Sequence, residues 1–195
     1  FNGLETTSKY RENNQNFNIF GMTGCLNIYN SNLKKNIIKV FNGQCEDSLN
    51  IVNSTGDIEN IHINNAFSDA IDFDFSNLII NKILVNKANN DCLDLSNGVY
   101  ETSSTELSFC RDKAISIGEK SKLKLFEAVI KNSNIGISIK DLSFLKANKL
   151  NIKNSPTCLE AFMKKEEFGG GNAKINILNC DKNIIIDENS IIEIN

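Results

Sequence analysis

Five short segments that recur between residues 69 and 161 decide the fold: DAIDF at 69–73, DCLDL at 91–95, KAISI at 113–117, IGISI at 135–139 and TCLEA at 157–161. Each begins 22 residues after the one before it. Weaker copies begin at Gly24, Asp47 and Lys182, the last after a step of 25 residues. Repetition at a fixed period predicts a solenoid, in which each repeat forms one coil and stacks on its neighbours.

Within each repeat, apolar and polar residues alternate with period two and branched side chains are frequent, which is typical of β-strands. Asn, Ser, Gly and Asp separate the strand segments, because these residues tolerate turn conformations. We predict an all-β fold, a single-stranded parallel β-helix of about eight coils of 22 residues, over residues 21–195. Residues 1–20 show no clear repeat and are expected to form a cap or the end of a preceding coil. The longer last step predicts a small loop insertion at 164–171.

Residues that share a phase in successive coils should stack about 4.8 Å apart, the spacing of hydrogen-bonded strands. The predicted inward columns are Leu26, Leu49, Ile71, Leu93, Ile115, Ile137, Leu159 and Ile28, Ile51, Phe73, Leu95, Ile117, Ile139. Cys25, Ser48, Ala70, Cys92, Ala114, Gly136 and Cys158 form a column of small residues that indicates a tight corner. Asn132, Asn154 and Asn179 are assigned to one turn phase, where stacked amides form a ladder.

Charge and hydropathy exclude two classes of partner. The chain has 195 residues with 21 basic and 24 acidic side chains, a net charge of −3, which argues against nucleic acid. No apolar stretch approaches the roughly 20 residues that a membrane helix needs, so no membrane insertion is expected. The chain opens at Phe1 without a signal peptide and is expected to be a mature form or an excised fragment. The 32 asparagines are assigned mainly to turns.

An outward column predicts the most acidic surface: Asn27, Asn50, Asp72, Asp94, Ser116, Ser138 and Glu160. Asp69, Asp74 and Asp91 flank this column, so these carboxylates should crowd within two coils. Hard cations such as Ca²⁺ take oxygen ligands of this kind, and we hypothesise a Ca²⁺- or uronate-binding face with Asp72 and Asp94 as metal ligands. The alternative is a solvated strand surface whose acids block edge aggregation.

The landmarks CRDKAISIGEKSKL (110–123), NSNIGISIKDLS (132–143) and MKKEEFGGG (163–171) resemble right-handed parallel β-helix repeat domains of bacteria. The resemblance is to the type found beside spore-coat-kinase-like (CotH-type) modules on surface or secreted proteins, and it covers roughly residues 20 to 195. It implies a right-handed winding and an extracellular or cell-surface location. The wider superfamily includes pectate lyases, polygalacturonases and alginate epimerases. Its lyases and epimerases pair an acidic Ca²⁺ site with a basic residue, and Arg111 or Lys113 are the candidates here.

Six cysteines, at positions 25, 45, 92, 110, 158 and 180, lack the spacing of a zinc site. Cys25, Cys92 and Cys158 share a column but lie three coils apart, about 14 Å at strand spacing. A disulfide needs Cα atoms within about 7 Å, so we interpret the cysteines as buried thiols that fill space. Pairing between different columns, for example Cys25 with Cys45, stays open.

These patterns favour a non-catalytic binding or spacer module of a bacterial surface or secreted protein, with polysaccharide as the expected contact. The alternative is a Ca²⁺-assisted lyase or epimerase that acts on a uronate polysaccharide through the Asp69–Asp94 face. The absence of Trp speaks against sugar stacking, and no recognisable catalytic set supports an enzyme. Uncapped coils would also expose strand edges and core, which predicts end-to-end self-association.

Overall fold

The fold is a parallel β-solenoid, described by a computed structural model for residues 1–3 and 21–195. All regular elements of these residues are strands, so no helix here could cross a membrane. One sheet, which we call the short-strand sheet, contains β1 (Gly24–Tyr29), β3 (Asp47–Val52), β5 (Asp69–Asp74), β7 (Leu93–Ser96), β9 (Lys113–Gly118), β11 (Ile135–Lys140), β13 (Thr157–Phe162) and β15 (Asn183–Ile186). The other, the long-strand sheet, contains β2 (Asn32–Phe41), β4 (Thr55–Ala66), β6 (Asn77–Ala88), β8 (Val99–Cys110), β10 (Lys122–Lys131), β12 (Phe144–Lys153), β14 (Asn172–Asn179) and β16 (Ile191–Ile194).

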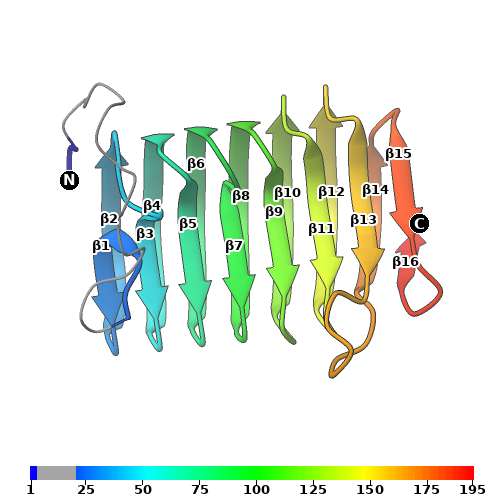
Figure 1. The fold of residues 1–195 in the computed structure, drawn as a ribbon, viewed down its shortest axis with the longest axis horizontal. Coiled ribbons are helices and arrows are strands. Elements are labelled where there is room, and N and C mark those ends of the chain that lie inside the picture. Colours follow the sequence, from blue (N-terminus) through cyan, green and yellow to red (C-terminus); the bar gives the residue numbers. More distant parts are fainter. Residues whose placement is uncertain (4–20) are drawn as a thin grey trace.

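Each coil consists of one strand from each sheet, and every strand pairs in parallel with its equivalents in the neighbouring coils. In Figure 1 the chain descends along the nearer sheet, rises along the farther one and advances to the right, which is a right-handed winding. Eight strands about 4.8 Å apart place the first and the last strand about 34 Å from each other. The predicted solenoid of about eight coils is confirmed.

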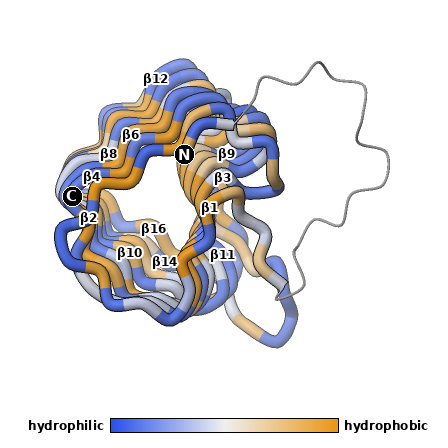
Figure 2. Tube along the Cα trace, turned by 90° about the vertical axis from the view of Figure 1, so that its left-hand side faces the viewer, coloured by the Kyte–Doolittle hydropathy of each residue, from blue (hydrophilic) through white to orange (hydrophobic). Residues whose placement is uncertain are grey.

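The core fills the space between the two sheets, where Figure 2 shows a continuous apolar lining. Leu49 pairs with Ile71, and Ile115 with Ile137, so residues one repeat apart stack as predicted. From the second to the sixth coil, the side chains of both inward columns are buried. Burying one such side chain stabilises the folded state by about 1.5–3 kcal/mol. Every coil adds this contribution again, because the apolar residue recurs once per repeat.

Columns of asparagine occupy the corners of the coils, where the backbone adopts the positive φ values of the left-handed region. Asn30, Asn53 and Asn97 have φ values of 49°, 49° and 48° at one corner, a conformation that Asn tolerates better than most residues. At another corner, Asn154 Nδ2 donates to Asn132 Oδ1 at 3.0 Å, so this ladder forms. The assignment of Asn179 to the same ladder was wrong. Asn179 pairs in register with Asn151 inside the strands, because the insertion before β14 changes the step length.

A serine column lies at the first of these corners, one residue after the asparagine column. One coil replaces the serine hydroxyl with that of a tyrosine. Ser76 Oγ accepts a hydrogen bond from Ser54 N (3.0 Å) and donates to Asp74 O (2.8 Å). The next coil has Gly98 at this position, and the Tyr100 hydroxyl occupies the space there, since a Cβ on Gly98 would lie 2.3 Å from Tyr100 Oη. Tyr100 is buried and its hydroxyl donates to Phe73 O at 3.0 Å.

The six cysteines form three disulfides, Cys25–Cys45, Cys92–Cys110 and Cys158–Cys180, so the interpretation as buried thiols was wrong. Each bond joins the beginning and the end of one coil, in the first, fourth and seventh coils. The corner column of small residues faces a second column, formed by Ala66, Ala88 and Cys110, across the coil. This close approach brings the Cα atoms of the middle pair to 5.4 Å.

The segment 164–171 leaves the coil between β13 and β14 and is held against a neighbouring corner. Asp141 Oδ1 accepts hydrogen bonds from the backbone N–H groups of Lys164 (2.9 Å) and Lys165 (2.8 Å). The Lys165 ammonium also bonds the carboxylate of Glu119, and the Phe168 ring lies 5.3 Å from Lys120 Nζ. The loop therefore adds a small anchored projection to the rod.

Candidate functional site

Six aspartates meet on the outer face of the short-strand sheet, around β3, β5 and β7. We call them the carboxylate cluster: Asp47, Asp69, Asp72, Asp74, Asp91 and Asp94. Asp72 pairs in register with Asp94, and Asp47 pairs with Asp69. The five predicted ligand-binding acids therefore lie together. Asp47 was missed, although it stands one repeat of 22 residues before Asp69 and so shares its phase.

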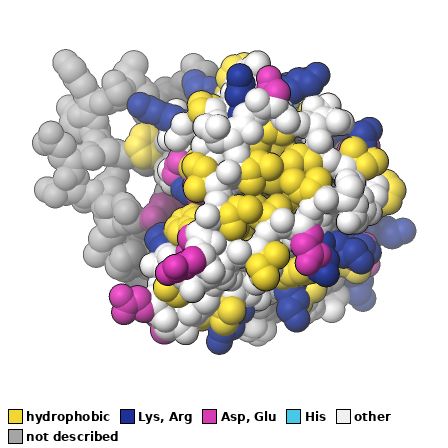
Figure 3. All heavy atoms as spheres, turned by 90° about the vertical axis from the view of Figure 1, so that its right-hand side faces the viewer, with side chains coloured by type: hydrophobic (Ala, Val, Ile, Leu, Met, Phe, Trp, Pro, Cys, Tyr) yellow, Lys and Arg dark blue, Asp and Glu magenta, His cyan; other side chains and the backbone are white. Residues whose placement is uncertain are grey.

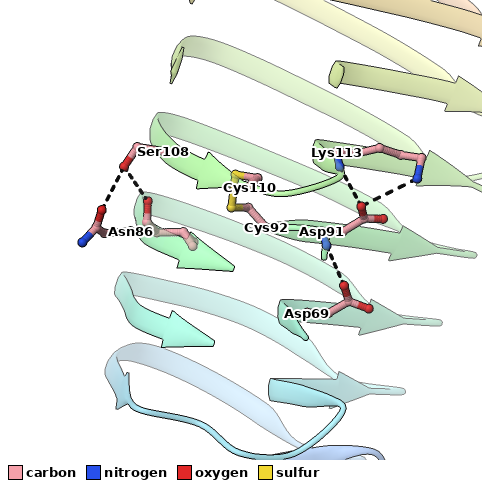
Figure 4. Close-up of a disulfide and its surroundings, with 8 residues drawn as sticks. Asp69, Asn86, Asp91, Cys92, Ser108, Cys110 and Lys113 are labelled. Carbon is pink, nitrogen blue, oxygen red and sulfur yellow. Dashed lines mark hydrogen bonds and ion pairs between the residues drawn. A yellow bond between two sulfur atoms is a disulfide. The ribbon is translucent and has the colours of Figure 1, made fainter. Parts of the chain in front are cut away.

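Asp69 and Asp91 connect successive coils through the backbone. Asp69 Oδ1 accepts a hydrogen bond from Asp91 N at 2.7 Å, and Asp91 Oδ1 accepts one from Lys113 N at 2.8 Å (Figure 4). Burial raises the pKa of Asp69 to about 6 and that of Asp91 to about 7, although the Lys113 charge works against the second shift. Burial also raises the pKa of Asp47 to about 7. Asp69 and Asp91 therefore cap backbone N–H groups, and all three carboxyls carry a cost of desolvation.

Asp72 and Asp74 form the centre of the cluster together with Asn50. The Asn50 amide donates to Asp72 Oδ2 (3.0 Å) and to Asp74 Oδ2 (3.4 Å). Burial, followed by the charges of Asp74 and Asp47, raises the pKa of Asp72 far above its usual range, and burial also raises the pKa of Asp74. Two close carboxyls cannot both ionise cheaply, so Asp72 keeps its proton and shares it with Asp74. At neutral pH the pair therefore holds one proton between its two carboxyls and presents acceptor oxygens.

Basic residues border the cluster on the side of the later coils. Lys113 Nζ lies 3.7 Å from Asp91 Oδ1 and also bonds the Asp112 carboxylate. Burial lowers the pKa of Lys113, but the bond to Asp112 and the Asp91 charge outweigh it, so the net pKa is raised. Lys113 is therefore a cation held in place. Arg111 is exposed at the end of β8, and its side chain makes no ion pair within the described part of the chain.

Lys140 completes this face and was not singled out from the sequence. Its Nζ donates to Ser116 Oγ at 2.7 Å, and its stem lies over Gly118, where an added Cβ would be 3.0 Å from Lys140 Cε. Ser116, Ser138 and Asn50 are buried, although all three belong to the outward column. The interpretation as a solvated strand surface was therefore wrong at these positions. Lys140 reaches over to Ser116, and Asn50 is engaged by Asp72 and Asp74.

The candidate metal ligands Asp72 and Asp94 occupy adjacent outward positions. Asp94 Oδ1 accepts a hydrogen bond from Leu95 N at 2.9 Å, and Asp72 is engaged with Asn50. Within residues 1–3 and 21–195, no group of three or more His, Cys, Asp or Glu side chains has the geometry to hold a metal ion. The arrangement as it stands offers hydrogen bonds to polar groups, and a cation would have to draw the carboxylates together and remove the proton of Asp72.

No protein-family model matches the chain, and neither the curated proteins nor the solved structures give a significant match. The fold is therefore established by the sequence repeat and by the structure. The residues of the carboxylate cluster are the basis for its proposed chemistry.

Proposed function

We propose that this chain is a non-catalytic β-solenoid module of a bacterial surface or secreted protein, a rigid spacer with one polysaccharide-contacting face. The observation that carries the proposal is the set of three disulfides that close the first, fourth and seventh coils. Such bonds persist in oxidising compartments. They brace the rod at regular intervals, which suits a part that must keep its length outside the cell.

Rigidity comes from three kinds of contact that repeat along the rod. Both sheets continue through all coils, with register shifts in the β2–β4 and β13–β15 pairs. The Asp69, Asp91 and serine side chains add bonds between coils. Each disulfide closes a loop of about 20 residues, which stabilises the fold by about 3 kcal/mol through the unfolded state. A chain held in this way resists bending and stretching along its axis.

The carboxylate cluster is the face that we propose contacts polysaccharide. The Asp72–Asp74 pair offers acceptor oxygens to sugar hydroxyls, and Lys113 and Lys140 add cations beside it. The exposed ring of Phe75 directly follows Asp74 and supplies an apolar surface for a sugar ring. Polar groups beside an aromatic ring form the common chemistry of sugar recognition sites.

The second candidate function is the Ca²⁺-assisted lyase or epimerase, which the concentration of six acids within three coils favours. The protonation states speak against it at neutral pH. A general base must be unprotonated to take a proton, whereas the ion pairs of Lys113 hold it as a cation.

A glycan array probed with and without a chelator tests the binding proposal, with Asp72→Ala and Asp94→Ala as site variants. Asp57→Ala, on the exposed side of the long-strand sheet, is the matched control. We expect polysaccharide binding that the site variants weaken and the control keeps. Binding to no glycan, or binding that all variants retain, would disprove the polysaccharide face.

The same proteins, incubated with uronate polymers and Ca²⁺, test the enzyme candidate through the ultraviolet absorbance of the unsaturated elimination product. We expect no increase. A clear increase that Asp72→Ala and Asp94→Ala abolish would replace the module by a lyase.

A further inference from the structure

Lysine collects on one part of the long-strand sheet. Of the 21 basic side chains in the chain, seven belong to β10, β12 and β14, and these three strands carry a single acid, Glu127. The preceding strands β4, β6 and β8 instead have four acids and two lysines. Figure 3 views the rod from the end of the last coil and shows Lys and Arg side chains along its right-hand edge, the side of the long-strand sheet. A chain with a net charge of −3 therefore has a local basic surface.

The first halves of β10, β12 and β14 form a set of three outward rows, which we call the basic patch. Its side chains point outward, because the residues that alternate with them, such as Leu125, Ala147 and Ile175, are buried. In-register pairing of the strands places equivalent residues side by side. The rows of the basic patch are Lys122, Phe144 and Asn172, then Lys124, Lys146 and Lys174, and then Phe126, Asn148 and Asn176.

The middle row places three lysines on adjacent strands, about 4.8 Å apart along the rod. Like charges directly opposite one another destabilise a sheet. Acids on the flanking strands neutralise the outer two lysines, since Lys124 lies 2.8 Å from Glu101 and Lys174 lies 3.0 Å from Glu193. The central Lys146 is exposed and makes no ion pair within residues 1–3 and 21–195. The fold gains nothing from this unpaired charge, which is open to an anion from outside.

An exposed aromatic ring lies beside the middle row. Phe126 is 62% exposed, whereas the next two coils have Asn148 and Asn176 at this position, and their amides hydrogen-bond each other at 3.1 Å. An aromatic ring on an outward strand position offers an apolar surface against which a sugar ring can pack. Cations and amides around such a ring supply the few polar contacts that fix the orientation of a ligand. The basic patch therefore combines charge with sugar-binding chemistry.

We propose that the basic patch binds an acidic polysaccharide, with carboxylate or sulfate groups on the middle row and a sugar ring against Phe126. A polymer laid along the solenoid axis crosses β10, β12 and β14 in turn, so that anionic groups on successive sugar units meet successive lysines. The disulfides favour an oxidising compartment, where acidic polysaccharides are more common polyanions than nucleic acids. This inference goes beyond the proposed function, because it adds a second polysaccharide face on the other sheet.

Isothermal titration with dextran sulfate, polygalacturonate, uncharged dextran and a single-stranded DNA oligonucleotide tests the proposal. Dextran sulfate and dextran share a backbone and differ in charge, so their comparison isolates the role of the anionic groups. We expect both acidic polysaccharides to bind and dextran not to bind. Binding should weaken as salt is added, since exposed charges are screened beyond about 8 Å at about 0.15 M ionic strength. The tighter of the two acidic polymers identifies the preferred anionic group.

Variants of the middle row measure the contribution of its charges. Lys146→Gln should weaken binding several-fold, and the triple variant that adds Lys124→Gln and Lys174→Gln should weaken it at least ten-fold. Phe126→Asn introduces the residue that the next two coils have at this position, and it should also weaken binding several-fold.

The matched control removes three lysines from the later parts of the long strands and breaks one exposed ion pair, that of Lys82 with Glu106. It combines Lys82→Gln, Lys131→Gln and Lys153→Gln, and we expect it to bind like the wild type. Circular dichroism and the thermal midpoint establish that each variant is folded.

Three outcomes would overturn the proposal: no binding of either acidic polysaccharide, equal losses in the middle-row triple variant and its control, or tighter binding of the DNA oligonucleotide than of both polysaccharides. The last result would indicate a nucleic-acid surface instead. Asp72→Ala in the carboxylate cluster should leave binding at the basic patch unchanged, and the triple variant should keep the glycan binding of the carboxylate cluster. The two proposals can therefore fail separately.

Discussion

Neutralising the buried Asp91 carboxylate should stabilise this protein at alkaline pH. Asp91 is buried and its Oδ1 accepts the backbone N–H of Lys113 at 2.8 Å, a bond that the amide oxygen of Asn can also accept. Burial raises the pKa of Asp91 from 3.8 to about 7, so the ionised form is disfavoured in the folded protein. Asp91→Asn keeps the shape of the side chain and removes its ionisation.

The sign and size of this change in the free energy of unfolding follow from the linkage between proton binding and folding. Because the folded-state pKa lies above the unfolded value, the protonated carboxyl stabilises the fold at low pH, and this contribution is lost as the pH rises through about 7. A shift of about 3 units corresponds to at most about 4 kcal/mol at 1.36 kcal/mol per unit. Losing the ion pair to Lys113 costs the variant about 0–1 kcal/mol. We expect a net gain of about 2–3 kcal/mol at about pH 8 and little difference near pH 4.

Urea unfolding with intact disulfides, followed from about pH 4 to about pH 8, measures this effect. The wild type should lose stability as the pH rises, since Asp47 and Asp69 have raised pKa values as well. Asp91→Asn should flatten that slope, while the exposed control Asp57→Asn should leave it as in the wild type. A wild type that gains stability towards pH 8, or an Asp91→Asn protein with the wild-type slope, would refute the reasoning.

Three further predictions concern the core and the corners. Replacing both Cys92 and Cys110 with Ser should lower the free energy of unfolding by about 3 kcal/mol, because the disulfide no longer restricts a loop with a sequence separation of 18 in the unfolded chain. An unchanged urea midpoint would contradict this prediction. Tyr100→Phe should cost about 1–2 kcal/mol, because it removes a buried hydroxyl that donates to Phe73 O, and chemical denaturation that shows no loss would speak against the role of the hydroxyl. Phe75→Asn should stabilise the fold by about 1 kcal/mol, because Phe75 has a φ of 50° at a corner where the neighbouring coils have Asn53 and Asn97. A lower thermal midpoint would contradict this and show that packing of the Phe75 ring stabilises the fold.

Local alternation and a constant period were enough to predict the strands, their stacking and the inward columns. Ile71 and Ile115 could be placed in one file because parallel in-register strands put equal phases on top of one another. The same argument placed Asp72 beside Asp94 and would have placed Asp47 beside Asp69. The error at Asn179 arose where the insertion at 164–171 changes the step, since a period predicts register only while it is constant.

The path of the chain around each coil required the structure. Cys92 and Cys110 approach because two columns of small residues face each other across a corner, and nothing in their separation of 18 residues reveals how sharply the chain turns between them. The burial of Ser116 and Ser138 depends on where the Lys140 stem lies, which a strand pattern leaves free.

The sequence by itself determined which residues stack, because register between coils depends only on spacing along the chain. Only the tertiary structure decided which columns face one another and which outward groups lose their water. Those properties depend on distances across a coil and on neighbouring surfaces, and the burial that raises the pKa of Asp72 follows from them.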